Sequence, residues 1–127
     1  MKNEENDLYI LEIERFSIML DDFDEIFKGK DIELQKVLNQ NTLNSVKRKN
    51  LNLLLFAVRS YQGSIKRIAS KYEDLKTNID FNLLSNHEQK LIGELENKLN
   101  RSLETSRRII DKYNDFLIPD EKTNDLV

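Results

Sequence analysis

The fold is decided by residues 51–79, LNLLLFAVRSYQGSIKRIASKYEDLKTNI. Apolar side chains recur in this stretch at alternating intervals of three and four residues, through four heptads without a slip. This period is typical of a helix that packs one face against other helices, as in a coiled coil. It predicts a long helix over about 43–78. The seam consists of Leu51, Leu54, Val58, Tyr61, Ile65, Ile68, Tyr72, Leu75 and Ile79.

The composition favours the same class of fold for the whole chain. Its 127 residues suffice for one domain, and 34% of them are charged. Only three Gly and one Pro are present, too few for a fold built on tight turns. We therefore expect an all-α protein: a long antiparallel helical hairpin with a long N-terminal helix and a short helix, in a three- or four-helix coiled-coil-like bundle. The bundle would span 1–119 as a single domain, followed by a polar tail over 120–127.

A first helix is predicted over about 6–28, with Asp7 as its N-cap and Gly29 just past its end in the left-handed conformation. A short helix is then expected over 31–38, starting at Asp31. The seam of the first helix is Tyr9, Ile13, Phe16, Leu20, Phe23 and Phe27, and Ile10, Leu11, Ile18 and Met19 widen it enough to touch a second neighbour.

The last helix is predicted to begin at Ser85, where Ser85 and Glu88 match a capping box, and to stop before Pro119. Its apolar spacing is less regular than that of 51–79. The expected seam is Ile92, Leu95, Leu99, Leu103, Ser106, Ile110, Tyr113 and Leu117.

Charge is segregated along the chain behind a net value of −3. Residues 1–33 carry 11 acidic and four basic side chains, whereas residues 34–72 carry eight basic and no acidic ones. An acidic first helix should attract the basic 43–78 helix. A nucleic-acid surface is the competing interpretation, but the basic residues are scattered, no aromatic platform lies beside them, and the whole chain is acidic. We therefore expect no nucleic-acid partner.

Residues that carry out chemistry are scarce in this sequence. The chain has no Cys, and its one His, His87, lies inside the capping box. The acidic run 21–25 lacks the spacing of a calcium loop. These features predict a protein that is not an enzyme and has no cofactor and no metal. Because no run of 18 apolar residues occurs and the start is acidic, we expect no membrane association and a cytoplasmic location.

Apolar residues are concentrated in 51–58 and 109–118. A helix that is apolar all round must be buried on every side. Two interpretations of the first cluster remain open: the short 31–38 helix folds over it, or Leu53, Leu55 and Phe56 form an interface with another chain. A first helix of 23 residues would cover only about two thirds of the hairpin, leaving one stretch open to a partner helix.

Three local patterns resemble the FlgN family of flagellar export chaperones. One is the junction FKGKDIEL at 27–34, where a helix ends at Gly29 and restarts. Another is NKLNRSL at 97–103, which is similar to an Asn-x-aliphatic-Asn-Arg-x-Leu pattern in the last helix of that family. The third is YNDFLIP at 113–119, ahead of a polar tail. Residues 43–79 match nothing in the family pattern.

The resemblance implies a cytoplasmic chaperone that binds the C-terminal helices of secreted flagellar hook-associated proteins at the hook–filament junction, and delivers them to the type III export apparatus. It implies substrate contacts by Leu103, Ile110, Tyr113, Phe116 and Leu117, with docking to the export gate as another role for Tyr113. For Asn97, Asn100 and Arg101 it implies a polar contact that fixes helix register.

The alternative function is a self-assembling coiled-coil structural or interaction protein, for example of a phage or mobile element, without catalytic activity. It would assemble through the 51–79 heptads into a tight homo-oligomer. The chaperone interpretation instead predicts a monomer or a weak homodimer.

Overall fold

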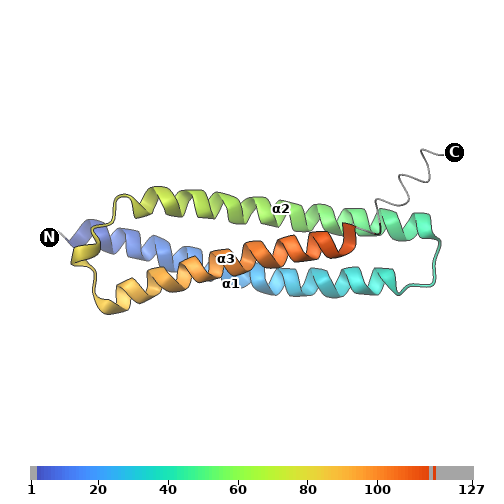
Figure 1. The fold of residues 1–127 in the computed structure, drawn as a ribbon, viewed down its shortest axis with the longest axis horizontal. Coiled ribbons are helices and arrows are strands. Elements are labelled where there is room, and N and C mark those ends of the chain that lie inside the picture. The colour runs from blue at the N-terminus through green and yellow to red at the C-terminus, as the bar shows by residue number, and fades with distance from the viewer. Residues whose placement is uncertain (1–2, 115, 117–127) are drawn as a thin grey trace.

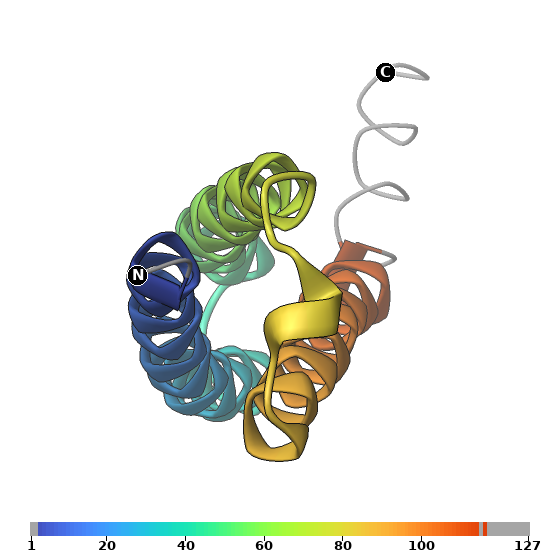
Figure 2. The ribbon, with the colours of Figure 1, turned by 90° about the vertical axis from the view of Figure 1, so that its left-hand side faces the viewer.

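The computed structural model describes residues 3–114 and 116. They form three long helices, α1 (Asn3–Leu38), α2 (Asn44–Lys76) and α3 (Asn86–Asn114), with a 3-10 turn, η1 (Phe81–Leu83), between the last two. Successive helices run in opposite directions along a rod (Figure 1), and each of the three contacts the other two. Seen end-on, they surround a common axis (Figure 2). The expected all-α bundle is confirmed; the 120–127 tail lies outside the described residues.

α1 is one continuous helix of 36 residues, about 54 Å long, so the expected break at Gly29 is wrong. No described residue has a positive φ, and Gly29 lies in mid-helix. Phe27 and Leu34, seven residues apart, are both fully buried. A helix that continues through Gly29 buries both side chains on one face, which outweighs the roughly 1 kcal/mol that glycine costs in a helix. Asp7 and Asp31 are accordingly interior helical residues, not N-caps.

The α2 seam is confirmed except at one turn, where Leu55 is buried and the expected Leu54 is half-buried. Leu51, Val58, Ile65, Ile68 and Tyr72 are buried, and each is at most 4% exposed. The seam positions between them are half-buried, and Ile79, just beyond the helix, is buried as well. The heptads of α2 therefore pack against α1 and α3 within one chain.

α3 begins with the predicted capping box. The Ser85 N–H donates to Oε1 of Glu88 at 2.9 Å, and the Glu88 N–H donates to the Ser85 hydroxyl at 3.1 Å. The seam of α3 is more regular than expected. Ser102 and Ile109 are buried in the core, whereas Leu103 and Ile110, which were expected there, are half-buried. The buried positions step by three and four residues: Ile92, Leu95, Leu99, Ser102, Ser106, Ile109 and Tyr113.

The outer face of α1 carries apolar side chains that nothing in the described structure covers. Of the four residues expected to widen its seam, only Ile10 is buried. Leu11 and Ile18 are 56% and 63% exposed, and Met19 is also exposed. α1 does contact two neighbours, but it does so through the seam side chains and their immediate flanks.

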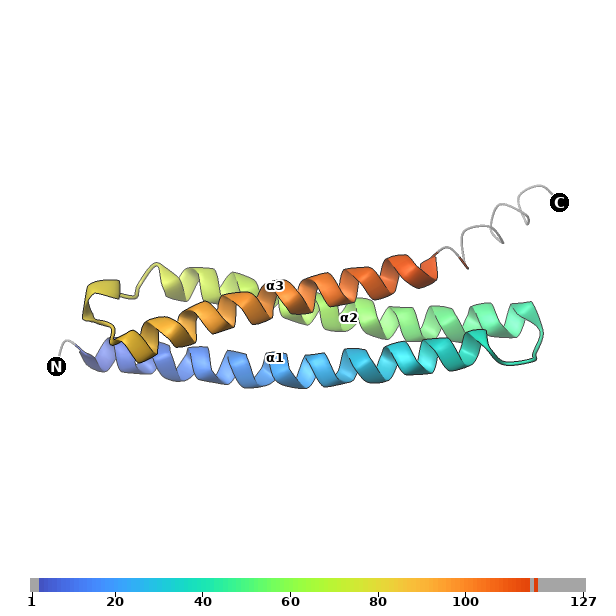
Figure 3. The same cartoon turned by 60° about the horizontal axis from the view of Figure 1, so that its bottom comes forward.

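Within the described residues the under-covered stretch lies at the α1–α2 loop, and it is α3, not the first helix as expected, that does not reach it. α1 is the longest helix, whereas α3 starts beside the N-terminal end of α1 and its described part stops short of the α1–α2 loop (Figure 3). At that loop, Nζ of Lys47 donates to the carbonyl of Leu38 at 3.3 Å and so caps the end of α1. No described helix is both long and apolar enough to cross a membrane.

Candidate binding surface

The largest exposed apolar side chains of α2 lie on one line along its outer side. Leu53 and Phe56 are 62% and 70% exposed, and Val46 and Leu43 are exposed near the start of the helix. Val46 and Leu53 are one heptad apart, and Phe56 follows three residues later, so the three share one face. We call the face formed by Val46, Lys49, Leu53, Phe56, Ser60 and Arg67 the outer α2 face.

This face explains why 51–58 is apolar in seven of eight positions. Two seams run along α2, and they overlap in this segment. Leu51, Leu55 and Val58 belong to the inner seam and are buried, whereas Leu53 and Phe56 belong to the outer α2 face. Leu55 is completely buried, so the structure places it in the core and not at the interface for which the sequence proposed it. Residues 31–38 do not fold over Leu53 and Phe56.

Basic side chains border the outer α2 face. Lys49 and Arg67 lie on it, and Arg59, Lys66 and Lys71 lie beside it; all five are exposed. None of the five forms an ion pair with another described residue. The ion pairs between described residues of different helices instead involve α3: Lys76–Glu96, Lys98–Asp21 and Lys112–Asp31. The predicted attraction between α1 and α2 therefore does not consist of ion pairs made by these five basic side chains.

The substrate-contact residues expected on α3 do not form one exposed surface. Leu103 and Ile110 are half-buried against the core, and Phe116 is 47% exposed. Tyr113 is completely buried. Leu117 lies outside the described residues. Tyr113 and Phe116 remain neighbours, with ring centroids 6.5 Å apart.

The side chain of Tyr113 joins α3 to α1. Its hydroxyl donates to Oδ1 of Asp31 at 2.8 Å and lies 3.2 Å from Oε1 of Gln35. Nζ of Lys112 lies 3.5 Å from the same Asp31 oxygen and 5.1 Å from the Tyr113 ring centroid. Burial, and then the bond to Asp31, raise the pKa of Tyr113. These contacts give Tyr113 a structural role.

An equivalent cluster joins α2 to α3 nearer the η1 end. The Tyr72 hydroxyl donates to Oε2 of Glu96 at 2.5 Å, and Nζ of Lys76 lies 2.8 Å from the same oxygen. The bond from Lys76, followed by that from Tyr72, lowers the pKa of Glu96. Burial is the main cause that raises the pKa of Tyr72.

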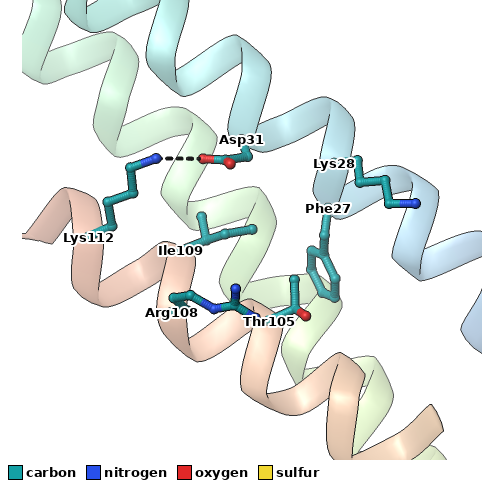
Figure 4. A pocket seen from close by; sticks show the side chains of 7 residues that line it. All are labelled: Phe27, Lys28, Asp31, Thr105, Arg108, Ile109 and Lys112. Carbon is teal, nitrogen blue, oxygen red and sulfur yellow. Dashed lines mark hydrogen bonds and ion pairs between the residues drawn. The ribbon is translucent and has the colours of Figure 1, made fainter.

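A shallow cleft of about 220 Å³ lies between α1 and α3 (Figure 4). The buried side chains of Phe27 and Ile109 form its apolar part, and the Lys112–Asp31 pair crosses one end of it. Arg108 and Thr105 line the α3 side and Lys28 the α1 side. The cleft is too small for a helix, since it falls below the usual volume range of drug-sized ligand sites.

The polar residues of the family-like pattern are all on the surface. Asn97, Asn100 and Arg101 are exposed, and none of them hydrogen-bonds to a described residue of another helix. The polar contacts that do fix register come from residues that the sequence pattern did not reveal. Buried Asn6 donates to the Asp80 carbonyl at 3.2 Å, and Gln62 donates to buried Ser106 at 3.0 Å.

His87 is exposed, and within the described part of the chain no three His, Asp or Glu side chains are grouped as metal ligands would be. No protein-family model matches the chain, and no match was found among curated proteins or solved structures.

Proposed function

We propose that this protein is a binding module that holds an amphipathic helix of a partner protein against the outer α2 face. The observation that carries the proposal is the exposure of Leu53 and Phe56 on the same helix face as Val46. Single exposed apolar residues are ordinary on protein surfaces, but a row along one helix marks a surface for another helix. An amphipathic partner would complete it with side chains spaced by three and four residues.

The geometry of the bundle supports a helix as the ligand. From Val46 to Phe56 the face is about 15 Å long, which corresponds to roughly three helical turns. The rest of α2 is held from behind by its inner seam, so the surface is presented on a preformed helix. A disordered partner segment would then bear most of the ordering cost, which gives modest affinity and permits later release.

The resemblance to the FlgN family names a partner class, the C-terminal helices of secreted hook-associated proteins. Of its three patterns, the junction at 27–34 contains no helix break, the pattern at 97–103 lies within α3, and the pattern at 113–119 lies partly outside the described residues. On this proposal the protein is a cytoplasmic export chaperone, and the partner binds the outer α2 face.

Self-assembly through the 51–79 heptads has less support. Those heptads already pack against α1 and α3, so another copy could use them only if the bundle opened. Replacing both Ile65 and Ile68 by Asp should therefore unfold the chain and not merely separate an oligomer.

Titration calorimetry with C-terminal segments of hook-associated proteins from the same source tests the proposal. We expect a one-to-one complex whose formation raises the helix content measured by circular dichroism. If no such segment binds, the chaperone assignment fails. A complex with an unrelated amphipathic helix would retain the binding module and remove the flagellar partner.

A further inference from the structure

The outer α2 face combines exposed apolar side chains with basic side chains that no other described residue pairs with. Residues 34–72 contain eight basic and no acidic residues. Lys49, Arg59, Lys66, Arg67 and Lys71 are exposed and form no ion pair with other described residues. An exposed helix ordinarily intersperses acidic residues among its basic ones at three- and four-residue spacing. Because residues 34–72 contain no acidic residue, four of these basic side chains, those of Lys49, Arg59, Lys66 and Arg67, have no acidic neighbour at this spacing.

The positions of these cations suit contacts with a helix lying on the face. Lys49, Leu53 and Phe56 follow one another at spacings of four and three, so Lys49 continues the apolar row. Arg59 and Lys66 are one heptad apart and flank the row on one side, as the charged edge positions of a coiled coil do. Arg67 continues the row toward the η1 end of α2.

Arg67 shows that the cations keep donors available for a ligand. Its Nη2 donates to the Ser64 hydroxyl at 2.9 Å, and that hydroxyl donates to the Ser60 carbonyl at 3.3 Å. A guanidinium has five N–H donors, and the Ser64 contact uses only part of them. A carboxylate facing Arg67 could accept two of the others in parallel.

We infer that the helix held on the outer α2 face is acidic, with apolar residues at three- and four-residue spacing flanked by Glu or Asp. The inference rests on the binding role proposed above and adds the partner's chemistry. Leu53 and Phe56 receive the apolar row of the partner, while Arg59, Lys66 and Arg67 face its carboxylates. The charge contacts set the orientation and the choice of partner more than the total affinity.

Two other occupants fit the face less well. A nucleic acid would make few contacts with the apolar side chains of Leu53 and Phe56. It would also lie near α1, where residues 1–33 carry a net charge of −7 and would repel it. A second copy could offer the outer side of α1, where Leu11 and Ile18 are exposed on an acidic helix. That contact joins two different faces, so it would not close into a simple twofold dimer.

Three synthetic peptides test the inference on the full chain. Each has 18 residues and the same Leu positions at heptad spacing, and the flanking positions are all Glu, all Gln or all Lys. Fluorescence anisotropy measures their affinities at low and at high salt. We expect the Glu peptide to bind about tenfold more tightly than the Lys peptide at low salt, because several weak surface ion pairs act together, and the difference to shrink at high salt.

Matched variants locate the effect. Arg59→Glu combined with Arg67→Glu should reverse the preference, so that the Lys peptide binds more tightly than the Glu peptide. Arg101→Glu combined with Arg107→Glu makes the same charge change on exposed positions of α3 and should leave the preference as it was. Circular dichroism confirms that each variant is folded before its affinities are compared.

The outcomes separate the inference from the proposed function. Equal affinity for the Glu and Lys peptides, or no reversal in the Arg59/Arg67 variant, overturns the acidic partner while leaving helix binding in place. Binding of none of the three peptides overturns the proposed function itself. A 16-base-pair DNA duplex that binds more tightly than the Glu peptide overturns the inference. So does a chain whose light-scattering mass shows self-association that the Glu peptide does not disperse.

Discussion

The hydroxyl of Tyr72 on α2 and the carboxylate of Glu96 on α3 meet at 2.5 Å, and Lys76 binds the same carboxylate oxygen at 2.8 Å. Near the other end of α3, Tyr113 and Lys112 meet Asp31 of α1 in the same way. In each cluster a tyrosine and a lysine of one helix bind the same carboxylate of a neighbouring helix. These two clusters fix the register of α3 against both neighbours.

Glu96→Gln should lower the free energy of unfolding by about 0.5–1 kcal/mol at pH 7, a modest loss because the side chains of Lys76 and Glu96 are each more than a third exposed. The folded state lowers the pKa of Glu96. Its contribution is therefore present above the ordinary carboxyl pKa near 4.5 and is lost as the pH falls through the lowered folded value.

Urea unfolding of both proteins across this pH range measures the effect. The difference between wild type and Glu96→Gln should narrow as the pH falls below about 4.5. Glu94→Gln, an exposed change on the same helix, is the control and should show no comparable narrowing. A difference that stays constant down to pH 2.5 would show that the charge of Glu96 contributes nothing to stability.

Tyr113→Phe should lower the free energy of unfolding by about 1–2 kcal/mol, since it removes the hydroxyl that bonds Asp31 and Gln35 from a completely buried ring. Tyr9→Phe is the matched control, because the Tyr9 ring is half-buried and its hydroxyl bonds no described residue. Urea midpoints give the comparison. Equal midpoints for the two variants would contradict the structural role assigned to Tyr113.

Gly29→Ala should stabilise the protein by about 0.5–1 kcal/mol, because alanine is the better helix former and a Cβ at this position meets no atom within 4 Å. If Gly29 instead ended a helix in the left-handed conformation, the same change would destabilise. Gly93→Ala, inside α3 and equally unobstructed, should show a gain of the same size. Thermal unfolding of the two variants distinguishes a continuous α1 from a broken one.

Leu55→Ala and Leu53→Ala compare a core position with a surface position two residues away. Leu55 is completely buried, so its truncation should cost about 2–5 kcal/mol, whereas Leu53→Ala should change stability by no more than about 0.5 kcal/mol. Urea unfolding measures both. A large loss from Leu53→Ala would mean that Leu53 belongs to the core and not to the outer α2 face.

The sequence predicted the bundle where its hydrophobic period was regular and misplaced residues where apolarity and period disagreed. In α2 the period and the apolar residues coincide, and the predicted seam matches the buried one except at Leu55, which is buried where Leu54 was expected. In α3 the heptad spacing places Ser102 and Ile109 in the core. The prediction placed Leu103 and Ile110 there instead, because Leu103 is more apolar than Ser102. A buried serine is recognised only when the packing of its neighbours is known.

The same limit applies to α1 and to the binding surface. A glycine followed by an Asp reads as a helix end and a new start, and only the burial of Phe27 and Leu34 on one face shows that the helix continues. The sequence did mark 51–58 as too apolar for one buried seam. It could not tell which side chains face outward, and so it grouped Leu55 with Leu53 and Phe56.

Partner affinity in two matched double variants tests the binding role of the outer α2 face most directly. Leu53→Ser with Phe56→Ser alters that face, and Leu11→Ser with Ile18→Ser removes as many exposed apolar residues from α1. If an amphipathic helix binds this face, calorimetry should show at least a tenfold loss of affinity in the α2 variant. A tenfold loss corresponds to about 1.4 kcal/mol, which is less than the free energy gained by burying two such side chains. The α1 variant should bind like wild type. Unchanged affinity in the α2 variant, or an equal loss in both, would contradict the account.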